Sequence, residues 1–373
     1  MMKQEILSAD NNYAELSAFI KNHKCKRILL VCDNSFEFLT IKDYFSDFSH
    51  NMNVELYRFS DFQPNPTYES VEKGVCFFVD NHCDTIIAVG GGSAMDVAKC
   101  IKLYSNMDHT KNYLKQSIVP NDVLFIAEPT TAGTGSEATR YAVICYNGEK
   151  QSVSHISCIP SAVVFDPYAL KTLPLYQKKS TMLDALCHAI ESYWSVNSDD
   201  ESKLYSKEAI QIILTNLSLY LENDDKGCAE MLRAANIAGK AINITQTTAG
   251  HAMCYKLTSL YGISHGLAAA LCVSKLFPYM IEHSEKCVDK RGKVYFENIC
   301  KEIAVSMGCT AAKEGAAELQ NIIDSLNPEI PAANENDFEI LKKSVNPVRL
   351  KNNPVELNSD DIDMLYHQIL QKR

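Results

Sequence analysis

The stretch Thr85-Ile-Ile-Ala-Val-Gly-Gly-Gly-Ser-Ala-Met-Asp96 decides the fold. An apolar run typical of a buried strand ends in three glycines and passes directly into a helical pattern. Glycines let a backbone approach a phosphate closely, and a helix N-terminus offers free N–H groups and a positive dipole end. Ser93 and Asp96 also fit a helix-capping arrangement, so phosphate binding and simple capping are both open interpretations of this stretch.

The surrounding segments extend this strand–helix unit. Three more apolar runs predict strands at Arg27–Cys32, Val54–Phe59 and Val123–Ala127, and a helix is predicted over 68–80. Strands that alternate with helices indicate a parallel sheet covered on both faces, as in Rossmann-like dinucleotide-binding domains. Residues 139–166 differ, because two β-rich runs joined by Asn147-Gly148 predict a hairpin.

The second half of the chain has helical spacing and no strand signal. We therefore expect an α/β domain over 1–174 and an all-helical domain over 175–373, with the boundary near Leu173-Pro174. The predicted helices cover 180–196, 201–222, 228–245, 266–284, 292–307, 310–325 and 359–371.

Composition excludes several classes of protein. The 373 residues carry 36 Lys+Arg and 46 Asp+Glu, a net charge of −10, and 46% are hydrophobic. This length suits two domains with their own cores, and the acidic balance without a basic cluster argues against nucleic-acid binding. We see no secretory signal and no apolar run of the roughly 18 residues that a membrane span needs. Fourteen cysteines without a C-x-x-C pair are typical of free thiols in a reducing compartment, so we expect a cytoplasmic protein.

A second polar loop follows the run 123–127. It reads Pro129-Thr-Thr-Ala-Gly-Thr-Gly-Ser-Glu137, with four hydroxyls and two glycines. Open α/β sheets bind ligands at the carboxyl ends of their strands, so this loop favours a nucleotide site. The loop lacks the lysine of a P-loop, which disfavours ATP hydrolysis and favours a dinucleotide.

Metal-ligating residue types occur in the helical half. Asp184 and His188 are spaced i, i+4 and project from one helix face, while His251 and His265 each adjoin small residues. One carboxylate and three imidazoles suit Fe(II) or Zn(II) and are poor ligands for Ca²⁺ or Mg²⁺. From Asp184 and His188 alone, a helical ion pair with two unrelated histidines is the favoured interpretation.

The chain resembles the iron-containing alcohol dehydrogenase family along nearly its whole length. The matching motifs are Pro64-Asn-Pro-Thr67, Gly90-Gly-Gly-Ser-Ala-Met-Asp96, the loop 129–137, Asp166-Pro167, Leu173-Pro174, Asp184-Ala-Leu-Cys-His-Ala-Ile-Glu191, and His251 with His265-Gly266. The resemblance implies a dinucleotide-binding α/β domain followed by a helical domain, with the active site in the cleft between them. It implies metal ligands at Asp184, His188, His251 and His265, holding Fe(II) or alternatively Zn(II).

The resemblance also implies a set of cofactor contacts. They are Asn65, Gly91, Gly92, Ser93, Asp96, Thr130, Thr131 and Thr134, with Lys150 added if the hairpin turn here is two residues shorter than in relatives. Asp33 falls where an acidic residue meets the adenosine ribose. A carboxylate there accepts from a 2′-hydroxyl and repels a 2′-phosphate, which favours NAD over NADP, although an ordinary turn aspartate is also an open interpretation.

The chain departs from the family next to the metal set. Tyr255 stands where many members carry a proton-shuttling histidine, so it either donates a proton or shapes the pocket. Lys256 adds a cation there, and the local sequence, with Arg349-Leu-Lys-Asn-Asn-Pro354, resembles the phosphonoacetaldehyde reductase branch. In that interpretation Lys256, with Arg140, pairs with the phosphonate dianion.

Together these features predict an NAD(P)-linked, metal-dependent reductase of a small aldehyde, or dehydrogenase of a primary alcohol. The resemblance to the branch named above implies phosphonoacetaldehyde, reduced to 2-hydroxyethylphosphonate, as one substrate, and relatives suggest a homo-oligomer, a dimer or larger. One alternative is a lyase or cyclising enzyme similar to dehydroquinate synthase, which uses bound NAD and a metal but consumes no net cofactor. Another is a non-catalytic NAD-binding protein, which has no use for a complete metal set.

Overall fold

A computed structural model describes residues 4–372 of the chain, which form two compact units. The α/β unit comprises the chain up to 131 together with 135–173 and 223–232. The helical unit comprises 132–134, 174–222 and the chain from 233 onwards. The chain thus passes from one unit to the other between Leu173 and Pro174, and two short segments are assigned to the unit that does not contain their neighbours in sequence.

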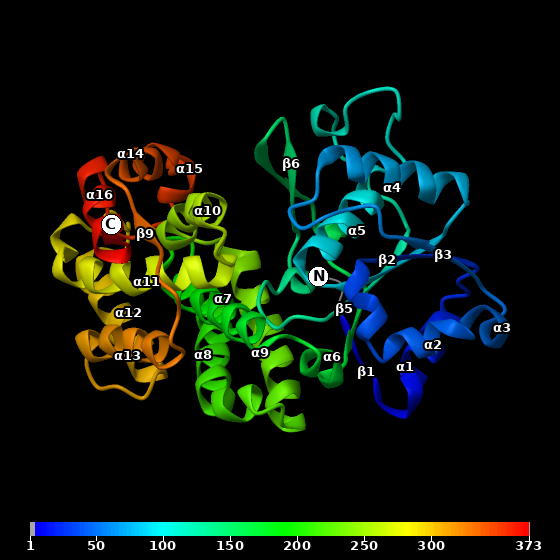
Figure 1. Cartoon of the computed structure of the whole chain (residues 1–373), viewed down its shortest axis with the longest axis horizontal. Helices are drawn as coiled ribbons and strands as arrows, with labels where there is room; N and C mark the ends of the chain where they lie inside the picture. Colours follow the sequence, from blue (N-terminus) through cyan, green and yellow to red (C-terminus); the bar gives the residue numbers. More distant parts are fainter. Residues whose placement is uncertain (1–3, 373) are drawn as a thin grey trace. The chain divides into compact units, whose positions relative to one another are not determined.

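The α/β unit is built on a six-stranded parallel sheet (Figure 1). This confirms the predicted fold class and the four predicted strands. Two further strands, β1 and β8, lie at one edge of the sheet. They have only four residues each and were not predicted as separate strands. In spatial order the strands are β1 (Glu5–Ser8), β8 (Ala162–Phe165), β5 (Leu124–Pro129), β4 (Thr85–Gly90), β2 (Arg27–Cys32) and β3 (Glu55–Phe59).

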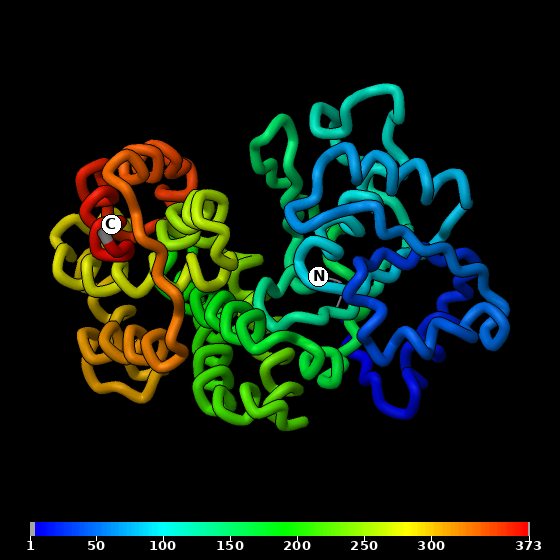
Figure 2. The backbone as a smooth tube through the Cα atoms, in the orientation of Figure 1, coloured from blue at the N-terminus to red at the C-terminus, as the bar shows by residue number. Residues whose placement is uncertain are grey.

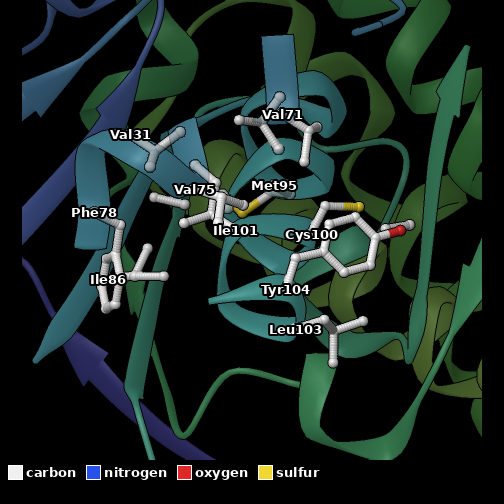
Figure 3. Close-up of a cluster of buried hydrophobic side chains, with 14 of the residues drawn as sticks. Val31, Val71, Val75, Phe78, Ile86, Met95, Cys100, Ile101, Leu103 and Tyr104 are labelled. Carbon is white, nitrogen blue, oxygen red and sulfur yellow. The ribbon is translucent and has the colours of Figure 1, made fainter. Parts of the chain in front are cut away.

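Each face of the sheet carries its own apolar core. On one face, helices α4 (Tyr68–Asp80) and α5 (Gly92–Tyr104) pack against the sheet. Figure 3 shows this core, with Val75 and Ile101 from the helices near Ile86 of β4. The other face is covered by α1 (Asp10–Asn22), α2 (Ile41–Ser46) and α3 (Phe48–Met52). A central strand that is buried on both faces is predominantly apolar, which is why the run before Gly90 contains no charge.

The predicted hairpin is confirmed. Strands β6 (Tyr141–Tyr146) and β7 (Glu149–Ser154) pair antiparallel across a two-residue turn. Asn147 and Gly148 both have positive φ angles, 52° and 78°, which is the geometry that a tight hairpin turn requires and that Asn-Gly favours.

The helical unit contains most of the predicted helices within a few residues of their expected bounds. They are α7 (Leu175–Trp194), α8 (Asp200–Leu221), α9 (Asp225–Thr245), α11 (His265–Glu282), α12 (Lys293–Ser306), α13 (Ala312–Ser325) and α16 (Ser359–Ile369). Three helices were missed: α10 (Ala249–Tyr261), α14 (Glu335–Ser344) and α15 (Pro347–Leu350). The first residues of α9 are assigned to the α/β unit.

The second half is not wholly helical. Two residues of β9 (Ala332–Ala333) pair in parallel with two of β10 (Gln371–Lys372). Figure 2 shows that the chain between α13 and α14, which includes β9, is extended. Pairs this short leave no periodicity in a sequence, so the expectation of an all-helical domain was wrong at this point.

Two whole-chain features follow from the described residues. Among residues 4–372, none of the helices combines the length and apolar character needed to cross a bilayer. All fourteen cysteines are free thiols, and most are buried as small core residues.

Candidate metal centre and cofactor-binding loops

Four predicted ligands lie together in the helical unit. Asp184 and His188 project from α7, His251 lies in the first turn of α10, and His265 begins α11. The Nε2 atoms of His251, His188 and His265 lie 3.3, 3.9 and 3.9 Å from Asp184 Oδ1. Asp184, His188 and His251 are almost fully buried, and their ligand atoms all lie within 4.8 Å of one another. Donors that share one tetrahedral ion are about 3.4 Å apart, so this set is close to the spacing that a metal ion requires.

The outer nitrogen of each imidazole already has a polar neighbour. His188 Nδ1 lies 3.4 Å from the Gly133 carbonyl oxygen, which can only accept, and His265 Nδ1 lies 3.5 Å from Cys254 Sγ. His251 Nδ1 donates to the carboxylate of Glu191. Because Nδ1 of His188 faces a carbonyl oxygen, its Nε2 lone pair faces the Asp184 carboxylate oxygen. His251 Nε2 lies 3.3 Å from the same oxygen, and loss of its proton would leave a second inward lone pair, so a metal cation suits this centre.

Glu191 contacts His251 and was not predicted from the sequence as a site residue. It follows Asp184 by seven residues and is fully buried. Besides the His251 imidazole, its Oε1 accepts from Thr248 N at 3.1 Å, Thr248 Oγ1 at 2.6 Å and His251 N at 3.3 Å. A buried carboxylate behind a metal-binding histidine fixes the orientation and tautomer of the ring. The i, i+4, i+7 spacing of Asp184, His188 and Glu191 on one helix was the available signal.

Gly250 and Gly266, which adjoin His251 and His265, lie where helices pack too closely to admit a side chain. A Cβ on Gly266 would lie 2.0 Å from the backbone oxygen of Ser180 and 2.8 Å from Asp184 Cβ. A Cβ on Gly250 would lie 2.5 Å from Val273 Cγ2 and 3.0 Å from Glu191 Oε1. Only glycine lets α10 and α11 come close enough to α7 for the imidazoles to meet Asp184.

The electrostatics of the centre favour a charged carboxylate. Burial by itself would raise the pKa of Asp184, but the imidazoles of His188, His251 and His265 outweigh burial and hold that pKa below its usual range. Burial lowers the pKa of His188. Burial would also lower the pKa of His251, but the Glu191 carboxylate opposes it and raises that pKa to about 9. One carboxylate oxygen and three imidazole nitrogens therefore fit Fe(II) or Zn(II).

In the α/β unit, the two polar loops meet at the carboxyl end of the sheet. Thr130 N donates to the Gly90 carbonyl at 3.1 Å, and a Cβ on Gly91 would lie 3.3 Å from the Thr131 methyl group. Gly91 caps α5 without a side-chain hydrogen bond, so the Ser93–Asp96 capping alternative is not what the structure shows. The first N–H groups of α5, from Gly92 and Ser93 onwards, thus have no capping side chain, which suits a pyrophosphate.

A buried lysine supports these loops and was missed in the sequence. Lys99 Nζ donates to Ser136 O at 2.6 Å, Ser136 Oγ at 2.9 Å, Thr139 Oγ1 at 3.1 Å and Tyr141 O at 2.7 Å. Lys99 thereby connects α5 to the end of the loop 129–137 and to the residues that follow it. Asp96 accepts from Ser136 Oγ at 3.3 Å, and burial raises its pKa to about 6 against the opposing charge of Lys99. The charge of Lys150 also acts to lower the pKa of Asp96.

The remaining predicted cofactor residues lie on loops. Asp33 follows β2 and accepts from Ser35 N at 2.8 Å through one oxygen. Asn65 is exposed, with a φ of 57°, in the loop before α4. Thr134 belongs to the short segment assigned to the helical unit. The structure therefore brings Gly91, Asp96, Thr131 and Lys150 into one neighbourhood, whereas Asp33 and Asn65 follow other strands.

Tyr255 and Lys256 differ in their relation to the metal set. Tyr255 follows His251 by one helical turn, and its ring stacks on His265 with centroids 5.5 Å apart and planes at 23°. Burial raises the pKa of Tyr255 to about 12, so it is a neutral phenol at physiological pH. Lys256 is half-buried and one residue further on, about 100° around the helix from Tyr255.

The α/β unit has loops suited to a dinucleotide phosphate, and the helical unit has one aspartate and three histidines suited to a metal ion. These two features are typical of metal-dependent enzymes that use a dinucleotide cofactor. Comparison with known proteins is consistent with that class. The profile of iron-containing alcohol dehydrogenases matches residues 3–167, and the profile for the C-terminal domain of the Fe-containing alcohol dehydrogenase family matches 178–370. The chain belongs to the iron-containing alcohol dehydrogenase family.

Individual relatives differ in length and chemistry. Aldehyde-alcohol dehydrogenase 2 of Entamoeba histolytica is 33% identical over 246 residues, which cover 62% of this chain but only 28% of that protein. The NADPH-dependent butanol dehydrogenase of Clostridium saccharobutylicum is 28% identical over 93% of this chain and 92% of its own. The crystal structure of sulfoacetaldehyde reductase from Bifidobacterium kashiwanohense with NAD⁺ superimposes with a TM-score of 0.86 at 24% identity, covering 99% of this chain and 97% of that one.

Proposed function

We propose that the protein is a metal-dependent, NAD(P)-linked reductase of a small aldehyde, which in reverse oxidises the primary alcohol. The observation that carries this proposal is the convergence of three imidazole Nε2 atoms on one buried oxygen of Asp184. An Fe(II) ion, or a Zn(II) ion, held by these four residues would act as a Lewis acid on the carbonyl oxygen. A nicotinamide cofactor supplies the hydride for the carbonyl carbon.

The residues of the chain supply binding, orientation and proton control. The α5 N-terminus and Thr130–Thr131 would hold the dinucleotide phosphates, and Asp33 would accept from the adenosine 2′-hydroxyl, favouring NAD over NADP. His188, His251 and His265 keep their Nε2 atoms turned inward. Tyr255, neutral and stacked on His265, shapes the substrate side of the metal set and offers a hydroxyl to the alcohol oxygen.

For the substrate, we infer an aldehyde with an anionic phosphonate group, phosphonoacetaldehyde, reduced to 2-hydroxyethylphosphonate. The support is the resemblance of the segments around Tyr255 and Arg349 to that branch of the family. Lys256 and Arg140 are the cations that the sequence offers for the phosphonate. We further place the protein in the cytoplasm, because all fourteen thiols are free, and expect it to act as a homo-oligomer.

The test is anaerobic NADH and NADPH oxidation by the Fe(II)-loaded protein. Phosphonoacetaldehyde is compared with propanal, an uncharged aldehyde of similar length. The proposal expects NADH oxidation with both, NADH to be preferred over NADPH, and phosphonoacetaldehyde to be the better substrate. Equal rates with both aldehydes would contradict the phosphonate-bearing substrate but would support the aldehyde reductase reaction. If neither aldehyde causes NADH or NADPH oxidation, the proposed reaction is contradicted.

A further inference from the structure

Arg349 lies at the outer end of a stack of side chains that begins at the metal set. In the helical unit, its guanidinium carbon is 4.9 Å from the ring centroid of Tyr255. The Tyr255 ring in turn stacks on His265, whose Nε2 atom is 3.9 Å from Asp184 Oδ1. Arg349 comes from α15, nearly a hundred residues after Tyr255, so neither spacing nor periodicity in the sequence links the two.

Within the described residues, this guanidinium has no carboxylate partner. Arg349 is half-buried, and its hydrogen bond within the described residues runs from a terminal nitrogen to Thr247 Oγ1 at 3.3 Å. Among residues 4–372, no carboxylate lies within 4.0 Å of it. A guanidinium has five N–H donors in a planar fork. Most of these donors therefore remain available to a ligand, and the fork matches two oxygens of a phosphonate or phosphate.

Helix geometry separates Arg349 from the cation that the sequence suggested. His251 and Tyr255 are one turn apart and share a face of α10. Lys256 is displaced from Tyr255 by about 100° around the same helix, away from that shared face. Arg349 instead lies directly on the ring that covers His265.

We propose that Arg349 is the residue that binds the anionic group of the substrate, while the aldehyde oxygen lies at the metal set. The proposal rests on the proposed function and deepens it: the substrate is an aldehyde with a phosphonate dianion a short distance from its carbonyl. Tyr255 acts as the spacer that holds Arg349 at that distance. Arg349 thus determines specificity, and the metal residues carry out the reaction with any aldehyde that reaches them.

The experiment compares Arg349→Gln, Arg349→Lys and Lys256→Ala in the Fe(II)-loaded protein, with Lys351→Gln as a control at an exposed cation two residues away. The kcat/KM is measured with phosphonoacetaldehyde and propanal. Arg349→Gln is expected to lower kcat/KM for phosphonoacetaldehyde about 30- to 100-fold and to change propanal by less than about 3-fold. Arg349→Lys is expected to be intermediate, because it keeps the charge but loses the fork. Calorimetric binding of ethylphosphonate, an unreactive probe, should weaken in parallel.

The outcomes separate the two proposals. If the unsubstituted protein shows no preference for phosphonoacetaldehyde, the substrate class is wrong and this inference is wrong with it. If the preference exists and survives in Arg349→Gln but is lost in Lys256→Ala, the proposed function stands and Arg349 is not the anion ligand. If Arg349→Gln does not fold, as judged by circular dichroism and metal content, Arg349→Lys decides. Unchanged phosphonate affinity in that variant then overturns the inference.

Discussion

The two units arrange their candidate sites by opposite means. In the helical unit, the site consists of side chains, one carboxylate and three imidazoles, and their outer atoms are held by Glu191, the Gly133 carbonyl and Cys254. In the α/β unit, the site consists mainly of backbone, the open N-terminus of α5 and a glycine that touches Thr131. A side-chain site can be inferred from residue types, whereas a backbone site depends on what holds the loops. The comparison predicts that metal affinity in the helical unit and cofactor binding in the α/β unit each depend on a different buried residue.

The largest expected effect concerns the carboxylate behind His251. Glu191→Gln keeps the size of the side chain but weakens its hold on the His251 imidazole, so metal affinity should fall about 10- to 100-fold. Affinity is measured by competition for Fe(II) or Zn(II) with a chelator of known strength. Glu302→Gln is the matched control, since Glu302 also accepts from a hydroxyl, that of Tyr193, but contacts no histidine. Equal metal affinity in both variants would show that Glu191 only stabilises the fold.

The second prediction concerns the lysine that holds the loops. Lys99→Met removes the four hydrogen bonds that its buried ammonium donates, so the KM for NADH should rise about 10-fold and stability should fall by about 1–3 kcal/mol. Lys102→Met is the matched control on the same helix, because Lys102 donates to Asn121 and Val123, away from the loops. Both should lower the free energy of unfolding in urea, but only Lys99→Met should raise the KM. A similar KM in the two variants would contradict a role for Lys99 in the cofactor loops.

The smallest expected effect is a pH dependence of stability. Glu128 in β5 is fully buried, neither carboxyl oxygen has a hydrogen-bond partner among the described residues, and burial raises its pKa well above the ordinary value. The folded protein therefore keeps a proton that the unfolded chain releases above about pH 4.5. Stability should fall as pH rises from there towards the folded pKa, by at most about 1.4 kcal/mol per pH unit.

Glu128→Gln removes this proton linkage and should be more stable than the unsubstituted protein at pH 8. Urea unfolding at pH 6 and pH 8 measures the difference, and exposed Glu149→Gln in the same unit is the control. If Glu128→Gln and the unsubstituted protein show the same change between the two pH values, Glu128 is ionised in the folded state and the prediction is wrong.

Prediction from sequence succeeded where a pattern repeats along the chain. Buried strands such as Arg27–Cys32 and long amphipathic helices such as α8 have clear periodicity, and their bounds were close to those observed. The four-residue β1 and β8 and the two-residue β9 and β10 are too short for a period, and they form because a neighbouring strand is available. The first turn of α10 is rich in small residues around His251, which hid its helical pattern.

For the site, residue types pointed to Asp184 and the histidines, but not to the residues behind them. Glu191 ends the motif 184–191, but its contact with His251 could not be predicted, because a sequence does not reveal which atom a buried carboxylate contacts. Arg349 meets Tyr255 through tertiary packing between α15 and α10. Nothing in the sequence distinguishes Lys99 from other helix lysines, because the residues that accept its hydrogen bonds come from a distant strand and loop. Such supporting contacts come from the fold, so spacing alone could not predict them.

The most direct test of the central claim measures metal content and turnover together in the unsubstituted protein and in His188→Ala. Both proteins are loaded anaerobically with Fe(II), and NADH oxidation is followed with phosphonoacetaldehyde and propanal. The account predicts about one ion per chain and turnover in the unsubstituted protein, and the loss of both in His188→Ala, since one of the inward-facing Nε2 donors is gone. Full turnover in a metal-free His188→Ala protein would contradict it.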